Sequence, residues 1–175
     1  MVRVLYFSYD GLLDPLGESQ IVPYVSAISD AGYSLTIISY EKVERTNEQI
    51  KSMETKLQKI GVQWVRLQFH TGKLWAIKRI ISGALLIRKL SRDLKPNFLH
   101  LRGFLPAVIF QLSLLRTPFL YDFRGFALGE WVDIGKLDKY SLLHNILNRL
   151  DQRAVRNASG FVVLEECAKE LLKDT

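Results

Sequence analysis

Short apolar runs alternate with helical patterns along the whole chain. The apolar runs have the length of buried strands and fall at residues 2–7, 35–40, 62–69, 98–101, 119–123 and 161–164. Apolar residues at helical spacing follow each run, at residues 20–31, 46–60, 73–94, 105–115, 140–156 and 166–173. Six apolar strands separated by helices predict an α/β fold, with a Rossmann-like parallel sheet and helices on both faces.

The loops that follow the predicted strands are the place to look for a ligand site. Right-handed crossovers bring these loops to one edge of the sheet. In open α/β sheets, ligands bind outside this carboxyl edge. The two longest of the loops, residues 8–20 and 124–136, are therefore expected to carry functional residues.

The first long loop ends in the sequence Gly17-Glu18-Ser19-Gln20. The pattern predicts a turn, followed by a helix from Gln20 with Ser19 as its N-cap. A glycine turn at a helix start exposes backbone N–H groups to an anion, although the Glu18 carboxylate adds a like charge. The alternative is a plain turn capped by Ser19. The spacing matches neither the dinucleotide motif nor the P-loop motif, so neither ligand is supported.

Two Arg-Gly pairs stand directly after predicted strands: Arg102-Gly103 and Arg124-Gly125. Guanidinium groups bind phosphate and carboxylate through paired hydrogen bonds. Because both arginines are expected at the carboxyl edge, they favour an anion pocket there. In the alternative interpretation, each arginine pairs with a nearby acid, for which the chain offers Asp122, Glu130 and Asp133.

The segment from residue 125 to residue 138 is predicted to be a glycine-rich loop. Within it, Glu130 and Asp133 are candidates to orient sugar hydroxyls or Arg124. Trp131 is a candidate to stack on a sugar ring. A capped surface loop with Trp131 buried explains the same residues, and the sequence leaves both interpretations open.

The basic charge of the chain is concentrated in one predicted helix. The formal net charge is +6, and residues 73–95 hold seven Lys and Arg residues against the single acid Asp93. One apolar face of this helix is expected to pack on the sheet, and it consists of Ile80, Leu86, Ile87, Leu90 and Leu94. A second apolar strip lies among basic residues: Leu74, Ile77, Ile81 and Leu85 beside Lys78, Arg88, Lys89 and Arg92.

Such interleaving of basic and apolar residues is typical of a helix that lies on an anionic membrane surface. In the alternative interpretation, neighbouring elements cover the second strip and the charges form a solvated face. No nucleic acid partner is expected, because the sequence has no recognised nucleic-acid-binding motif and no aromatic residues interleaved with the basic ones.

The remaining composition bears on location and chemistry. The single cysteine, Cys167, forms no intrachain disulfide, which favours a reducing compartment. No signal peptide is visible, and the apolar stretch at residues 104–115 is shorter than the about 20 residues that span a bilayer. The three histidines show no metal-ligand spacing. We therefore expect a cytoplasmic protein without a bound metal.

Several segments together resemble one enzyme family. The strand RVLYFSY, the segment LGESQIVPYVSAISDAGYSLTIIS, the pair HLRG and DFRGFALGEWVD, and the run LDQRAVRNASGFVVLEE are similar to the N-terminal domain of glycosyltransferase family four. The likeness covers essentially the whole chain. Its most specific part is the motif D-x-R-G-x-x-x-x-E, which runs here from Asp122 to Glu130.

The resemblance implies a GT-B enzyme, in which two Rossmann-like domains face each other across a cleft. Such enzymes transfer a sugar from a nucleotide sugar with retention of configuration, generally without a metal or other cofactor. The N-terminal domain would hold a glycan or lipid-linked acceptor, in cell-surface polysaccharide synthesis at the inner membrane face. Helical character persists to Thr175 without a stop signal. Residues 1–175 are therefore expected to form one domain, inactive alone, with a nucleotide-binding C-terminal domain beyond them.

The resemblance also implies roles for individual residues. The first loop approaches the donor diphosphate, and the loop after the fifth strand lies beside the donor sugar. Many members carry a histidine in that second loop, whereas this chain has Arg124. Arg124 and Glu130 are the catalytic candidates. The substrate-binding candidates are Gly17, Glu18, Ser19, Gln20, Arg102, Gly103, Asp122, Gly125 and Asp133. A non-enzymatic α/β binding or regulatory module of the flavodoxin type is the alternative.

Overall fold

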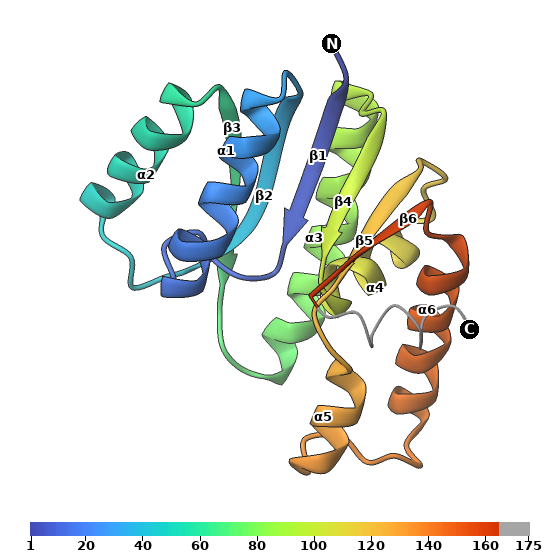
Figure 1. The fold of residues 1–175 in the computed structure, drawn as a ribbon. Coiled ribbons are helices and arrows are strands. Elements are labelled where there is room, and N and C mark those ends of the chain that lie inside the picture. Colours follow the sequence, from blue (N-terminus) through green and yellow to red (C-terminus); the bar gives the residue numbers. More distant parts are fainter. Residues whose placement is uncertain (165–175) are drawn as a thin grey trace.

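A six-stranded parallel sheet forms the centre of the computed structural model, which describes residues 1–164 (Figure 1). The strands are β1 (Arg3–Ser8), β2 (Ser34–Lys42), β3 (Val62–Phe69), β4 (Phe98–Arg102), β5 (Phe119–Phe123) and β6 (Gly160–Val163). Their order in the sheet is β3-β2-β1-β4-β5-β6, and every pairing is parallel. The order changes direction between β1 and β4, which is where open α/β sheets bind ligands. The predicted Rossmann-like fold is confirmed.

Helices cover both faces of this sheet (Figure 1). They are α1 (Val22–Asp30), α2 (Asn47–Lys59), α3 (Lys73–Leu94), α4 (Phe104–Ser113), α5 (Ala127–Asp133) and α6 (Leu142–Asn157), with a short π-helix, η1 (Gly17–Ile21), directly before α1. Strand alternation separates two apolar cores. On β1, Tyr6 packs with residues of α1 and α2, whereas Phe7 belongs to the core under α3, α4 and α6.

Helix α3 has the bounds that its hydrophobic pattern predicts, and the predicted face packs against the sheet. Ile87 is fully buried, with Ile80, Leu86, Leu90 and Leu94 packed around it. The helix approaches β2 closely, because the Tyr40 hydroxyl donates a hydrogen bond of 2.6 Å to the Arg79 carbonyl oxygen. A Cβ at Gly83 would lie 2.5 Å from the same hydroxyl, so this position has room only for glycine.

The turn predicted at residues 17–20 is wrong, because these residues lie inside a helix. Helical structure begins at Pro15, and the Glu18 N–H already donates to the Asp14 carbonyl oxygen at 3.0 Å. Ser19 is not an N-cap, since its hydroxyl donates to the Pro15 carbonyl oxygen. Gly17 is required by packing instead. A Cβ there would lie 2.7 Å from the Leu12 Cα and would overlap the carbonyl of the preceding loop.

The loop predicted at residues 125–138 contains helix α5. Its first turn closes through a hydrogen bond from the Glu130 N–H to the Phe126 carbonyl oxygen at 3.0 Å. Gly129 lies in the middle of this helix. Because glycine disfavours helix, the sequence pattern predicts a loop here. The last predicted helix, at residues 166–173, and Cys167 lie outside the described residues.

Candidate functional site

Charged and polar side chains meet at the carboxyl edge of the sheet, where the strand order changes direction between β1 and β4. We call this group the carboxyl-edge cluster, and it consists of Asp10, Gln20, His100, Arg102, Asp122 and Arg124. Its members come from the loop after β1, from η1, from β4 and from the end of β5. Parallel pairing places Arg102 directly beside Asp122 in the sheet. The sequence therefore placed both Arg-Gly pairs at the correct edge.

Asp122 is the centre of the cluster and has no solvent-exposed surface. Its Oδ2 accepts a hydrogen bond of 2.7 Å from Nη2 of Arg124, and its Oδ1 lies 2.7 Å from Nε of the same guanidinium. Nε2 of His100 lies 3.2 Å from Oδ2, and Nη1 of Arg102 lies 3.7 Å from it. One buried carboxylate thus neutralises part of the charge of two arginines.

These contacts set the protonation of Asp122. Burial on its own raises the pKa of this carboxyl group. The hydrogen bonds from His100 and Arg124, together with the Arg124 charge, outweigh the burial and hold the pKa below its usual value. Asp122 is therefore ionised at neutral pH and keeps its attraction for the Arg124 guanidinium.

Arg102 is buried among partners within the protein, of which Gln20 accepts a hydrogen bond and Asp122 and Asp10 lie at ion-pair distance. Its side chain is only 3% exposed. Nη2 donates to the Gln20 Oε1 at 2.9 Å, Nη1 faces Asp122, and Nε lies 3.8 Å from Asp10 Oδ2. This arrangement ties η1 to β4 and leaves Arg102 little surface for a ligand.

Arg124 differs from Arg102 because its side chain is 23% exposed. Both arginines pair with acids, as the alternative interpretation of the sequence proposed, and the acid that they share is Asp122. Glu130 and Asp133 form no ion pair with either arginine within residues 1–164. Arg124 is the member of the cluster that combines a fixed guanidinium with solvent access.

Glycines let the backbone bend at both strand ends. Gly103 has a φ of 83°, stands before the first residue of α4, and donates its N–H to the Asp122 carbonyl oxygen at 2.8 Å. Gly125 has a φ of 135°, and a Cβ there would lie 3.2 Å from Oε1 of Glu130. Residues with side chains rarely adopt these angles. The two glycines thus allow the chain to turn immediately after each arginine.

Aromatic rings support the cluster from the side of α1. The His100 ring stacks on Tyr6, with centroids 4.4 Å apart, and meets the edge of Tyr24 at 5.3 Å. Burial raises the pKa of Tyr6, and the Asp122 charge raises it further, so the Tyr6 hydroxyl stays protonated. The sequence did not single out His100 and Tyr6 as site residues. The period-two alternation that places His100 on the same face of β4 as Arg102 is the signal that was available.

Backbone N–H groups of the first loop bind the side-chain carboxylate of Glu41. Glu41, which is buried at the end of β2, accepts hydrogen bonds from the N–H groups of Leu12 at 2.7 Å and Leu13 at 3.3 Å. The Ser39 hydroxyl donates to the same carboxylate at 2.6 Å. The N–H groups that face this carboxylate are those of Leu12 and Leu13, not those of the predicted glycine turn at Gly17.

The candidate residues Gly17 to Gln20 from the first loop have different surroundings in the structure. Gly17 is buried against residues 11–12, and Glu18 and Ser19 are exposed on η1. Gln20 is the one residue of the Gly17–Gln20 set that belongs to the carboxyl-edge cluster, through the hydrogen bond that its Oε1 accepts from Arg102.

Helix α5 carries the candidates from the second long loop. Glu130 and Asp133 are exposed. Trp131 is half-buried and meets Phe104 edge to face, with ring centroids 5.5 Å apart. Trp131 therefore packs against Phe104 from a helix, whereas the alternative interpretation expected it buried in a surface loop. Within residues 1–164, His, Asp and Glu side chains form no group of three that would hold a metal ion.

The second apolar strip of α3 is exposed. Leu74, Ile77, Ile81 and Leu85 are between 55% and 77% exposed, and no described element covers them. The basic residues Lys78, Arg88, Lys89 and Arg92 are exposed beside the strip. None of the helices in residues 1–164 has the length and apolar content needed to cross a bilayer.

Comparison with known proteins shows a likeness in fold. No protein-family model and no curated protein matches the sequence. The structure of LpCGTa in complex with UDP has a TM-score of 0.51 at 10% identity, covering 93% of this chain and 46% of that one. A glycosyltransferase from Rickettsia africae ESF-5 has a TM-score of 0.47 at 14% identity, covering 74% and 33%. This chain therefore spans less than half the length of either protein.

Proposed function

We propose that this chain is the acceptor-side half of a GT-B glycosyltransferase that transfers a sugar from a nucleotide sugar. The observation that carries the proposal is the partly exposed Arg124 guanidinium, held by Asp122 at the carboxyl edge of the sheet. Ligands of open α/β sheets bind at this edge. The fold likeness to LpCGTa, whose structure contains UDP, supports a nucleotide sugar as the donor.

Arg124 is the proposed electrostatic catalyst of the transfer. The nucleoside diphosphate leaves with negative charge, which a fixed guanidinium stabilises without moving. Asp122 provides the fixation through its two contacts to Arg124. Arg102 acts as a positioning residue, because it touches Asp122, Asp10 and Gln20 instead of open solvent. Gly103 and Gly125 let the backbone come close to the substrates.

The acidic residues of α5 are proposed to orient the acceptor. The Glu130 carboxylate lies against Gly125, one residue beyond Arg124, and it is exposed. Carboxylates accept hydrogen bonds from sugar hydroxyls. Asp133 extends the same exposed acidic surface. On the opposite side of the cluster, Gln20 is placed to contact the donor, with Glu18 and Ser19 on the exposed surface of η1 next to it.

The other half of the enzyme is proposed to be a second Rossmann-like domain that holds the nucleotide. Support comes from the LpCGTa structure, of which this chain covers 46%. Retention of configuration and a role in cell-surface polysaccharide synthesis follow from the family resemblance of the sequence. The same resemblance favours a glycan or lipid-linked acceptor and no additional cofactor.

Helix α3 is proposed to hold the protein at the cytoplasmic face of an anionic membrane. Its exposed strip of Leu74, Ile77, Ile81 and Leu85 supplies apolar area. The flanking Lys78, Arg88, Lys89 and Arg92 supply attraction to anionic headgroups. A membrane-bound acceptor would then be presented to the enzyme from this side.

The proposal is tested by product formation with the full-length protein. The protein is incubated with a panel of uridine and guanosine diphosphate sugars, together with glycan and lipid-linked acceptors. We expect a glycosylated product whose new linkage, seen by NMR, has the anomeric configuration of the donor. Inversion would contradict the retaining mechanism. Absence of both transfer and donor binding across the panel would favour the non-enzymatic α/β module.

A further inference from the structure

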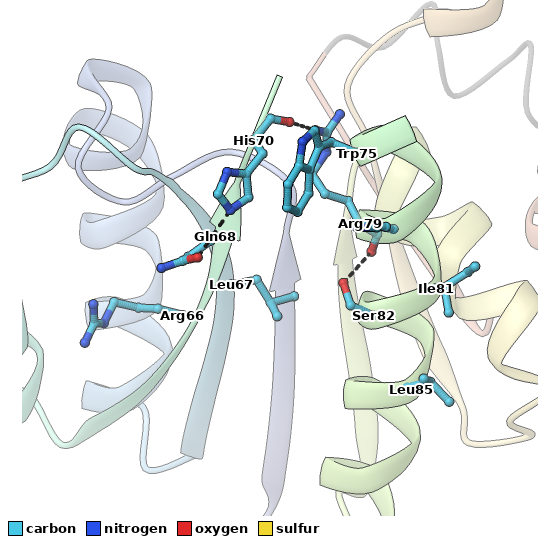
Figure 2. Close-up of a pocket in the computed structure, with 10 residues that line it drawn as sticks. Arg66, Leu67, Gln68, His70, Trp75, Arg79, Ile81, Ser82 and Leu85 are labelled. Atoms are coloured by element: carbon cyan, nitrogen blue, oxygen red, sulfur yellow. Dashed lines mark hydrogen bonds between the residues drawn. The ribbon is translucent and has the colours of Figure 1, made fainter. Parts of the chain in front are cut away.

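A groove of about 500 Å³ lies between the edge strand β3 and helix α3, and none of its lining residues belongs to the carboxyl-edge cluster (Figure 2). Its lining from β3 and the following loop is Arg66, Leu67, Gln68 and His70. Its lining from α3 is Trp75, Lys78, Arg79, Ile81, Ser82 and Leu85. The groove therefore joins basic, aromatic and aliphatic side chains.

Arg79 is the unusual member of this lining, because it is 9% exposed and has no acidic partner. Its Nε donates to the Tyr9 hydroxyl at 2.6 Å, and its Nη1 donates to the His70 carbonyl oxygen. The guanidinium carbon lies 4.3 Å from the centre of the Phe69 ring. Within residues 1–164, no carboxylate forms an ion pair with it.

A buried guanidinium without a counter-charge needs an explanation. Arginine stays protonated in proteins, so burial cannot neutralise it. Buried charges are normally paired with an opposite charge, because removal from water is costly. The neutral oxygens around Arg79 satisfy hydrogen bonds but supply no negative charge. An anion bound in the groove would supply it.

A second positive charge stands beside Arg79. Lys78 Nζ lies 4.5 Å from the centre of the Trp75 ring, which also stacks on His70 at 4.1 Å. No ion pair involves Lys78 among the described residues. Arg66 on the opposite wall is already paired with Glu54 at 3.1 Å. The free positive charge therefore gathers on the α3 side of the groove.

Three aliphatic side chains also line the groove, beside the polar Gln68 and Ser82. Leu67 on β3 and Ile81 and Leu85 on α3 line it (Figure 2). Ile81 and Leu85 also belong to the exposed strip of α3, which continues through Ile77. A ligand that fits both the basic and the aliphatic side chains of the groove carries an anionic group and a hydrocarbon chain.

We propose that this groove binds a phosphate group attached to a long hydrocarbon chain. Arg79 and Lys78 contact the phosphate, and Leu67, Ile81 and Leu85 contact the start of the chain. The assignment rests on the proposed glycosyltransferase function, since it names the acceptor class as a lipid phosphate. Tyr9 follows β1 at the carboxyl edge and binds Arg79, so it connects the groove to the edge that carries the cluster.

Binding of dodecyl phosphate to the full-length protein tests the proposal. Inorganic phosphate and uncharged dodecyl maltoside separate the contribution of the anion from that of the chain. We expect dodecyl phosphate to bind at least about tenfold more tightly than either. Arg79→Met should weaken its binding by at least about tenfold. Ser82→Trp should do the same by filling the groove from an exposed position, and the exposed Arg149→Met is the matched control.

Equal affinity of the wild-type protein and the folded Arg79→Met and Ser82→Trp variants would overturn the proposal. Equal affinity for inorganic and dodecyl phosphate would also overturn it, because the chain would then have no place in the groove. Sugar transfer to a chain-free glycan acceptor separates this proposal from the enzymatic one. If the protein transfers sugar but does not bind alkyl phosphate, only the groove proposal is wrong. If neither the wild-type protein nor any variant transfers sugar, the proposed glycosyltransferase function is wrong.

Discussion

The Arg124 guanidinium contacts the Asp122 carboxylate at two points, Nη2 to Oδ2 and Nε to Oδ1, each at 2.7 Å. The carboxylate is fully buried, whereas the arginine side chain is 23% exposed. This difference means that the carboxylate fixes the guanidinium from inside the protein while part of the guanidinium still reaches solvent. Fixed charge at a solvent-accessible edge is the property on which the proposed catalysis depends.

Replacement of Asp122 should destabilise the protein in a pH-dependent manner. Asp122→Asn leaves two arginines without their shared counter-charge, which we expect to cost about 3–5 kcal/mol in the free energy of unfolding at pH 7. The pKa of Asp122 is lower in the folded than in the unfolded chain. As the pH falls below about 4, the unfolded chain therefore takes up protons first, and the advantage of the wild-type protein shrinks.

Urea unfolding from pH 7 down into the acid range measures this difference. Asp30→Asn, at the exposed end of α1, is the control and should change the free energy of unfolding little at pH 7. A difference between wild-type and Asp122→Asn that stays constant into acid would show that the charge of Asp122 does not stabilise the fold.

Gly17 and Gly129 should respond in opposite ways to the same substitution. Gly17→Ala places a Cβ 2.7 Å from the Leu12 Cα, and we expect a loss of at least about 1–3 kcal/mol in the free energy of unfolding. Gly129→Ala lies in α5, where the nearest atom is 3.9 Å away. It should gain about 0.5–1 kcal/mol, because alanine favours helix more than glycine does. Thermal unfolding of both variants measures these changes in stability. A Gly17→Ala variant as stable as the wild-type protein would refute the packing role of Gly17.

Glu41 should hold the first loop in place. In Glu41→Gln one acceptor oxygen becomes an amide donor facing backbone N–H groups, and we expect a cost of about 1–3 kcal/mol. Hydrogen exchange of the Leu12 and Leu13 amides should become faster, because both donate to this carboxylate. The exposed Glu44→Gln provides the comparison. Unchanged exchange at both amides in Glu41→Gln would contradict the role.

The basic residues of α3 should control membrane binding. Replacement of Lys78, Arg88, Lys89 and Arg92 by glutamine should weaken binding to phosphatidylglycerol vesicles by about 1 kcal/mol per charge. A control variant loses the same charge elsewhere on the surface, at Lys51, Lys56, Lys59 and Lys139, which are all exposed. Vesicle sedimentation compares the two. Equal weakening would mean that net charge, and not the α3 surface, drives binding.

The hydrophobic pattern was sufficient for the fold because strands and helices here differ clearly in period. Helix α3 and strands β3 and β5 have the predicted bounds. The order of the strands was not needed to place Arg102 and Arg124, since parallel strands bring all such loops to one edge. The sequence pattern places the start of the first helix too late, because a glycine at position 17 is typical of a turn. Its actual requirement is tertiary contact with residues 11–12, which no local pattern reveals.

The partners within the site were harder to predict than its position. The sequence offered three acids for the arginines, and only the folded structure shows that Asp122 takes both. Glu41 and Tyr9 lie far from their partners along the chain, and their contacts exist only after β1, β2 and α3 have assembled. The groove beside Arg79 could not be predicted, because it forms between a strand and the helix that follows it.

The most direct test of the account is the turnover of the full-length enzyme carrying Arg124→Ala. With donor and acceptor identified, we expect kcat to fall by about a hundredfold or more, since a preorganised positive charge at the departing diphosphate is lost. The exposed Arg149→Ala should retain normal turnover. Near-normal turnover of Arg124→Ala, in a protein that folds as the wild type does, would contradict the central claim that the Asp122-held guanidinium serves sugar transfer.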